Sequence, residues 1–298
     1  MLLGYSTNSI GDVDPLDAIP LLHEMGYRSL AITLDHHTLD PYANDLPARI
    51  ARWRDALAAT GMACVVETGA RHLLDPMQKH EPTLVTADRE ARTRRTDFLR
   101  RAIDIAVDLG ATCVSLWSGV VRDSADEAAI WNRLTGSLAP VLDHAAARRM
   151  PLGFEPEPGM AIDTLARYRQ LFDRLGRPDH LRLTLDIGHM ECMGEQPMAD
   201  VLQPWADRVV NVHVDDMLAC RHEHLPLGTG DVDFPSILAA LAAGGYVGGL
   251  HIELPRQAHR WVETATQSAA FLMPLLRQLP RNLPPKLPPK LPPQESSR

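Results

Sequence analysis

The feature of this chain that most constrains its fold is a regular alternation of short apolar runs with longer segments of helical pattern. Eight such runs occur within about 280 residues. They are almost continuously apolar, which is typical of parallel strands buried on both faces. Parallel strands need long crossover connections, and each gap can hold a helix. The predicted strands are 2–8, 28–34, 62–67, 112–117, 151–155, 181–187, 209–214 and 249–254.

An eightfold strand–helix repeat of this length predicts a single-domain (β/α)8 barrel, or TIM barrel, over residues 1–279. A doubly wound sheet is the alternative, and it would be expected to carry a glycine-rich phosphate-binding turn after its first strand. That turn, residues 6–11, has no GxGxxG pattern. The expected helices are 15–25, 48–60, 88–110, 124–149, 162–175, 198–205, 235–243 and 258–278.

Two segments fall outside the repeat. The loop 68–87 is long for a connection between a strand and a helix, and loops of this length are often functional lids. The segment 280–298 repeats the unit LPPK. Because closely spaced prolines strongly disfavour a helix, this segment is predicted to be an extended, disordered tail.

Charge and composition exclude several classes of protein. The net charge is -8, and residues 281–298 contribute +3 to it, so the barrel carries about -11. A protein that binds the nucleic-acid backbone would need a basic face instead. No stretch of about 18 apolar residues exists, so no membrane span is expected, and the N-terminus does not resemble a signal peptide.

The cysteines indicate a reducing compartment. None of the four lies in a CxxC pair, and their spacing matches no zinc knuckle. We therefore expect reduced thiols in the core and a cytoplasmic protein. The cysteines are Cys64, Cys113, Cys192 and Cys220.

Ionisable residues stand at the ends of four consecutive predicted strands. They are Glu155, Asp186, His213 and Glu253. In a (β/α)8 barrel, the carboxyl ends of the strands meet at one mouth, which holds the active site. Three carboxylates brought together there would repel one another and raise one another's pKa, and a divalent cation removes that cost. The pattern therefore predicts a metal site.

Five motifs around these residues carry a resemblance to a known family. They are FEPEPG (154–159), LDIGH (185–189), VHVDD (212–216), LGTGDVDF (227–234) and HIEL (251–254). Taken together, they resemble the xylose isomerase-like barrels, specifically the sugar phosphate isomerase/epimerase group that shares its fold with endonuclease IV. The resemblance covers residues 1–278.

The resemblance implies that Glu155, Asp186, His213 and Glu253 ligate one divalent metal ion. Three oxygen ligands and one imidazole suit Mn²⁺ best, with Mg²⁺, Co²⁺ or Zn²⁺ as options. It further implies a sugar isomerase or epimerase. Glu155 would take a proton from the carbon next to a carbonyl, and Glu253 would deliver one to the opposite face. The metal would polarise the carbonyl and stabilise the enediolate.

Further residues are expected to contact a small carbohydrate substrate. The resemblance implies that His189 contacts a substrate hydroxyl, and Trp117 offers a stacking surface for a sugar ring. The loop 68–87 is locally basic, which suits a phosphate or an acidic sugar but also suits a solvated face. The expected substrate contacts are His189, Glu157, Trp117, His72, Arg221 and His224.

Several alternatives stay open from the sequence. His189, His222 and His224 would suit a second metal, zinc, although we favour substrate contact for this loop. A lyase or dehydratase acting on a keto-sugar or keto-cyclitol would use the same metal and base. A zinc hydrolase of the endonuclease IV type is disfavoured, because 116–119 lacks the histidine that a trinuclear site needs. A non-catalytic binder is disfavoured too, and a homo-oligomer is neither indicated nor excluded.

Overall fold

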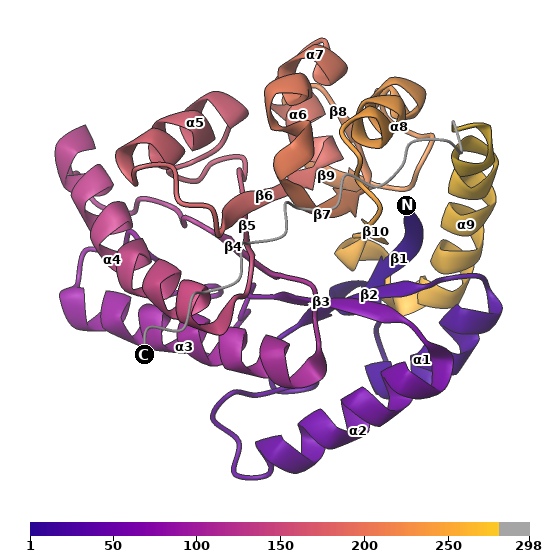
Figure 1. The fold of residues 1–298 in the computed structure, drawn as a ribbon, viewed down its shortest axis with the longest axis horizontal. Coiled ribbons are helices and arrows are strands. Elements are labelled where there is room, and N and C mark those ends of the chain that lie inside the picture. Colours follow the sequence, from indigo (N-terminus) through magenta and orange to yellow (C-terminus); the bar gives the residue numbers. More distant parts are fainter. Residues whose placement is uncertain (280–298) are drawn as a thin grey trace, which may run out of the picture.

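A closed barrel of eight parallel strands forms the centre of the molecule (Figure 1). This computed structural model describes residues 1–279, so the predicted tail 280–298 lies outside the described residues. The strands close in the order β1-β10-β7-β6-β5-β4-β3-β2, which confirms the predicted (β/α)8 barrel. They are β1 Leu2–Ser6, β2 Ser29–Thr33, β3 Ala63–Glu67, β4 Val114–Trp117, β5 Leu152–Glu155, β6 Leu181–Asp186, β7 Val209–Val214 and β10 Gly249–Ile252.

Helices surround this barrel, and most start at a side chain that caps their free N–H groups. Asp88, Asp126 and Thr164 accept hydrogen bonds from the backbone N–H groups of Ala91, Ala129 and Arg167. The α-helices are α1 Pro15–Glu24, α2 Leu46–Thr60, α3 Arg89–Leu109, α4 Glu127–Arg148, α5 Leu165–Arg174, α6 Ile187–Cys192, α7 Met198–Leu202, α8 Phe234–Ala243 and α9 Trp261–Gln278.

Short 3-10 helices complete the connections, and they explain one difference from the predicted boundaries. They are η1 Thr7–Ser9, η2 Gln203–Arg208 and η3 Pro255–Arg260. The last helix was expected from residue 258, but η3 occupies that position because Pro255 starts a tighter turn. The helices expected from 124 and 162 start three residues later, at the positions that their caps set.

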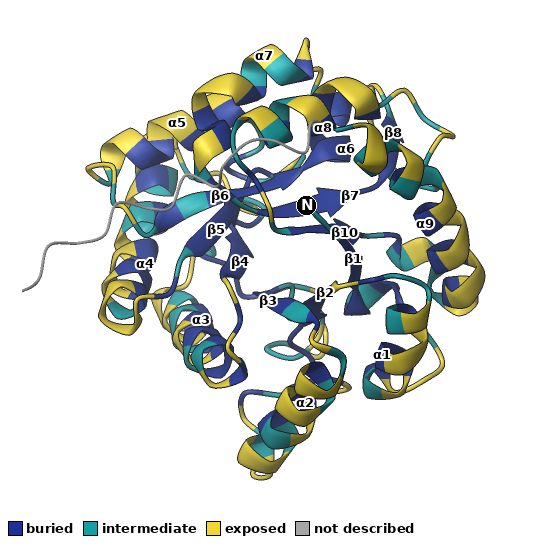
Figure 2. Cartoon of the chain, turned by 45° about the vertical axis from the view of Figure 1, so that its right-hand side comes forward, coloured by how far each residue is buried: buried dark blue, intermediate teal, exposed yellow. Residues whose placement is uncertain are grey.

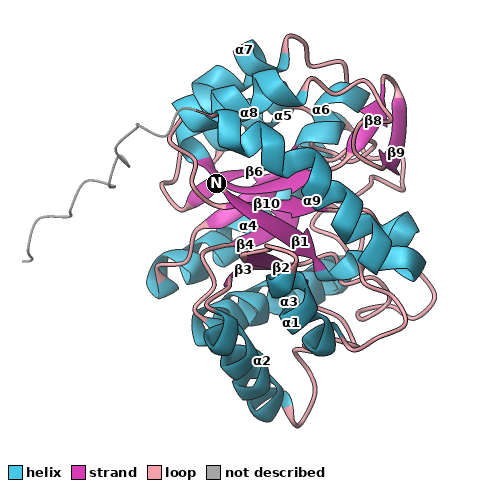
Figure 3. Cartoon of the chain, turned by 90° about the vertical axis from the view of Figure 1, so that its right-hand side faces the viewer, coloured by secondary structure: helices cyan, strands magenta, loops and turns pink. Residues whose placement is uncertain are grey.

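A two-stranded antiparallel hairpin replaces the loop that was expected after β7. It consists of β8 Asp216–Leu218 and β9 Arg221–Leu225. Figure 3 shows it apart from the barrel strands. The carboxylate of Asp216 accepts hydrogen bonds from the backbone N–H groups of Gly228, Gly230 and Val232. One side chain thus ties the hairpin to the following loop.

Burial follows the barrel pattern. In Figure 2, buried residues run along the strands and along the helix faces that are turned toward them. Cys64, Cys113 and Cys192 are buried, as expected for core thiols. The expectation was wrong for Cys220, which is exposed because it lies in the turn of the hairpin. Within residues 1–279, no helix has the length and apolar character needed to cross a membrane.

Candidate active site

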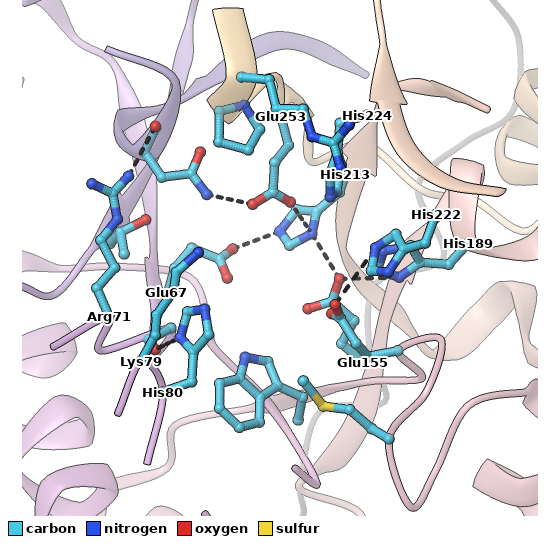
Figure 4. Close-up of a pocket in the computed structure, with 18 of the residues that line it drawn as sticks. Glu67, Arg71, Lys79, His80, Glu155, His189, His213, His222, His224 and Glu253 are labelled. Carbon is cyan, nitrogen blue, oxygen red and sulfur yellow. Dashed lines mark hydrogen bonds and ion pairs between the residues drawn. The ribbon is translucent and has the colours of Figure 1, made fainter. Parts of the chain in front are cut away.

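A cavity of about 720 Å³ opens at the carboxyl ends of the strands (Figure 4). This volume suits a small-molecule site, since such pockets commonly enclose about 300–1,000 Å³. Residues from the ends of β3, β4, β5 and β7, from the segment after β10 and from the loops line it. The cavity therefore lies where the fold places active sites.

Four ionisable side chains meet at the floor of this cavity, where Glu155, His213 and Glu253 line it and the fourth, Asp186, lies beside them. The structure brings Glu155, Asp186, His213 and Glu253 together, with one possible ligand atom from each within 4.8 Å of all the others. The Nδ1 atom of His213 lies 3.0 Å from Oε1 of Glu155 and 2.8 Å from Oε2 of Glu253. Strand register contributes to this arrangement, because Asp186 and His213 are direct partners across β6 and β7.

Burial makes this cluster electrostatically unusual. Burial raises the pKa of Glu155 to about 7, and the charges of Glu253 and Asp186 act in the same direction. The pKa of His213 is held well above its ordinary value, because Glu253, Glu67 and Glu155 outweigh the effect of its burial. The cluster thus holds several negative groups out of water with one imidazole between them.

The donor set fits a divalent cation. Oδ1 of Asp186 accepts a hydrogen bond from the backbone N–H of His189, but its buried Oδ2 has no hydrogen-bond partner in the part of the chain described here. A buried carboxylate oxygen without a partner is costly unless an ion or a proton satisfies it. Three carboxylates and one imidazole provide ligands that Mn²⁺ and related ions accept.

Residues that the sequence did not reveal support this cluster. Oε1 of Glu67 lies 2.9 Å from Nε2 of His213 and accepts a hydrogen bond of 2.8 Å from the Asn211 amide. The side-chain amide of Asn8 donates to Glu253. Glu67 ends β3 and Asn8 follows β1, so their strand-end positions were the only available signal. Such contacts orient metal ligands and set their protonation.

Three imidazoles form a second group beside the first. His189 belongs to α6, while His222 and His224 project from β9, and the ring centroids lie 4.9 to 5.9 Å apart. Each histidine offers a nitrogen within 4.8 Å of the other two. Burial lowers the pKa of His189 to about 4. Burial also disfavours the charged form of His224, but its ion pair with Asp215 raises its pKa to about 10.

The remaining expected substrate contacts divide into two groups. Glu157, Trp117 and His72 line the cavity, as do His189 and His224. Arg221 does not; it is exposed at the start of β9, and its guanidinium is not part of the cavity wall. Alternation along β9 explains this, because Arg221 is one residue from His222, and neighbouring strand residues point to opposite sides.

A match to a family model decides the family. The model of the xylose isomerase-like TIM barrel matches residues 19–275. The chain belongs to this family. The match spans β2 to β10 and therefore every strand that contributes to the ionisable cluster.

Proteins similar in sequence to this chain include epimerases. The chain is 24% identical to the putative L-ribulose-5-phosphate 3-epimerase SgbU of Escherichia coli (strain K12) over 238 residues, 74% of this chain and 82% of that protein. It is 25% identical to the L-ribulose-5-phosphate 3-epimerase UlaE of Salmonella heidelberg (strain SL476) over 260 residues, 86% of this chain and 85% of that protein.

A solved structure shares the fold. It is the D-allulose 3-epimerase of Methylomonas sp. in complex with D-allulose, which superimposes with a TM-score of 0.72 at 21% identity. The alignment covers 91% of this chain and 96% of that chain. At this identity, the likeness is one of fold alone.

Proposed function

We propose that the chain is a divalent-metal-dependent epimerase of a ketose or a related sugar derivative. The observation that carries this proposal is the cluster of Glu155, Asp186, His213 and Glu253. Their possible ligand atoms lie within 4.8 Å of one another, and all of these residues except Asp186 line the cavity. The names of the relatives, which are sugar 3-epimerases, support the same reaction class.

The four residues of the cluster would hold the metal ion. Mn²⁺ suits three carboxylates and one imidazole, and Mg²⁺, Co²⁺ or Zn²⁺ would be accepted by the same donors. When bound, the ion would polarise the substrate carbonyl and favour the negative charge that develops on its oxygen.

Glu155 would act as the base. It is buried, with 4% of its surface exposed, and burial raises its pKa to about 7. That pKa belongs to the metal-free protein, and a bound cation would lower it, so Glu155 would be an ionised carboxylate able to take a proton from the carbon next to a carbonyl. Removal of that proton gives an enediolate with a planar carbon, which has lost its configuration.

Glu253, in its protonated form, would give its proton to the other face of that carbon, while the proton removed from the substrate stays on Glu155. Its carboxylate reaches His213 from another direction than Glu155 does, as Figure 4 shows. The Asn8 amide donates a hydrogen bond to Glu253 and fixes its orientation. Removal from one face and return to the opposite face inverts the carbon, which is epimerisation.

The histidine group would contact the substrate. His189, His222 and His224 lie within reach of one another and beside the carboxylate cluster, so they could also hold a second ion. We favour contact with substrate hydroxyls for His189 and His224, since both line the same cavity as Glu155. A second ion would instead favour a zinc hydrolase, and counting metal ions per chain separates the two proposals.

The proposal is tested with protein loaded with Mn²⁺ and incubated with L-ribulose 5-phosphate, L-ribulose and D-allulose. We expect the 3-epimer of at least one of these ketoses, and its formation should stop in Glu155→Gln but continue in Glu90→Gln, a matched change on the exposed face of α3. A product lighter by one water would identify a dehydratase instead. A protein that binds no divalent ion would contradict the proposal.

A further inference from the structure

Two cations line the cavity on the side away from the carboxylate cluster. Arg71 and Lys79 belong to the loop 68–87 between β3 and α3. Figure 4 shows them across the cavity from Glu155 and His189. Among the residues that the structure describes, neither forms an ion pair with a carboxylate, whereas Arg256, which also lines the cavity, pairs with Glu223. Both charges are therefore available to a ligand.

The backbone of this loop is strained where it presents the cations. Ala70, Arg71 and His80 have φ values of +57°, +41° and +70°. Residues with a Cβ rarely adopt such angles, and they concentrate at ligand clamps and active sites. Main-chain hydrogen bonds hold the conformation, including one of 2.6 Å from His80 N–H to the carbonyl of Arg71. The fold thus maintains a costly conformation at this position.

Packing fixes the loop against the barrel. The ring of Trp117 contacts the guanidinium of Arg95, 4.4 Å from the ring centroid, and the ring of His80, whose centroid is 5.6 Å away in an edge-to-face arrangement. The Arg71 guanidinium donates a 3.0 Å hydrogen bond to the carbonyl of Asn8, whose side chain donates to Glu253. The cation is therefore held in place before a ligand arrives, which reduces the entropy lost on binding.

We propose that Arg71 and Lys79 bind a terminal anionic group of the substrate, a phosphate ester or a carboxylate, while the carbonyl end lies at Glu155 and Glu253. This inference rests on the proposed epimerase function. Guanidinium and ammonium groups are the usual partners of such anions. A cavity of about 720 Å³ has room for a five- or six-carbon ketose that carries one. A neutral ketose leaves both cations without a partner.

The test compares three ketoses in kinetics with the metal-loaded enzyme: L-ribulose 5-phosphate, the ketohexuronate D-fructuronate, and uncharged L-ribulose. We expect one anionic ketose to have a higher kcat/KM than L-ribulose. We call the kcat/KM of the anionic ketose divided by that of L-ribulose the charge preference. In Arg71→Gln and in Lys79→Gln, the charge preference should fall by roughly tenfold or more, as expected for loss of a hydrogen bond to a charged group. Arg94→Gln, the same charge change on the exposed side of α3, should leave the charge preference unchanged.

Of the two anionic ketoses, the one with the higher kcat/KM identifies the preferred anionic group as phosphate or carboxylate. Equal kcat/KM for charged and uncharged ketoses would overturn the inference. So would a charge preference that is the same in Arg71→Gln, Lys79→Gln and wild type.

Calorimetric titration with inorganic phosphate and with acetate separates this inference from the proposed function. If either anion binds, and binding weakens in Arg71→Gln but not in Arg94→Gln, the result supports an anion site at Arg71 and Lys79. That support holds even if no ketose is epimerised, in which case the proposed function alone fails. If the protein epimerises a ketose but neither binds anions at Arg71 and Lys79 nor prefers a charged ketose, the inference of an anion site fails and the proposed epimerase function stands.

Discussion

The two halves of the barrel mouth differ in what they present and in what holds it. In the half formed by β5, β6, β7 and β10, the ionisable groups lie at the strand ends themselves. In the half formed by β2, β3 and β4, the cations Arg71 and Lys79 come from a long loop, beside the ring of Trp117. One half thus has its metal-binding candidates on the rigid barrel, and the other has its cations on a connection, with Glu67 at the end of β3 as its strand-end charge.

This difference indicates a division between chemistry and recognition. Groups that exchange protons or hold a metal need placement within a fraction of an ångström, which strands supply better than loops. Loops vary more easily and often select the ligand. Asn8 links the halves, since its amide donates to Glu253 and its carbonyl accepts from Arg71. Changes to the strand-end carboxylates of the first half should therefore abolish turnover, and changes to the loop cations of the second half should alter substrate preference.

Glu155→Gln gives the largest expected effect. The neutral amide cannot accept a proton, so kcat should fall by about 10³-fold or more. Because one of several repelling buried carboxyls is removed, the free energy of unfolding of the metal-free protein should stay equal or increase. Steady-state kinetics and thermal denaturation measure both quantities. Turnover above one tenth of wild type would remove the distinction between the two halves.

Glu67→Gln tests whether support from the opposite half matters to the metal site. Glu67 ends β3, yet its carboxylate lies 2.9 Å from Nε2 of His213. Loss of that charge should weaken metal affinity by roughly 10- to 100-fold, as expected for a residue that orients a ligating histidine. Competition with a chelator of known affinity measures this. An affinity within twofold of wild type would show that His213 needs no such partner.

His224→Ala tests the role of the hairpin. If His224 contacts the substrate, KM should rise by roughly tenfold while the number of bound metal ions stays at one per chain. His259→Ala serves as a control, because His259 is exposed in η3 and lies outside the cavity. Two zinc ions in the wild type, with one lost in His224→Ala, would show instead that the hairpin completes a second metal site.

Glu195→Gln gives the smallest expected effect and isolates burial from function. Burial raises the pKa of Glu195 to about 7, as it does for Glu155, but Glu195 lies outside the cavity. Its unfolded pKa is about 4.3. Below that value, the folded and unfolded states are both protonated; above it, the folded state must bury a charge or retain a proton. Stability should therefore decrease as the pH rises from about 4.3 to about 7.

The variant should remove this pH dependence. At pH 8, we expect Glu195→Gln to be more stable than wild type by roughly 1 kcal/mol, a value reduced for partial exposure, with unchanged turnover. The amide oxygen can still accept the hydrogen bond from Leu165 N–H. Chemical denaturation at pH 4.5 and pH 8 measures the difference. Equal stability of the two proteins at pH 8 would contradict the account of the buried charge.

The barrel and the positions of the ionisable cluster could be predicted because both follow from local pattern. Apolar runs mark the strands, and the rule that their carboxyl ends share one mouth brings Glu155, Asp186, His213 and Glu253 together. The pairing of Glu67 with His213 could not be predicted, since the two residues are 146 positions apart and meet only across the closed barrel. A single polar residue at a strand end does not indicate which residue it contacts in the folded barrel.

The hairpin was missed for a different reason. β9 has the sequence RHEHL, with almost no apolar face, so periodicity gives no strand signal. Its structure depends on pairing with β8 and on Asp216, whose carboxylate binds backbone N–H groups of the following loop. For the same reason, the sequence could not show that His224 lines the cavity while Arg221 does not.

The most direct test of the central claim is incorporation of solvent deuterium. Metal-loaded enzyme in D₂O is incubated with the ketose that it prefers, and NMR follows the hydrogen on C3, the carbon next to the carbonyl whose configuration is inverted. We predict that its hydrogen is replaced by deuterium in both epimers, and that replacement is lost in Glu155→Gln. Conversion of the ketose with the hydrogen retained at that carbon, or equal exchange in Glu155→Gln, would contradict proton transfer through Glu155 and Glu253.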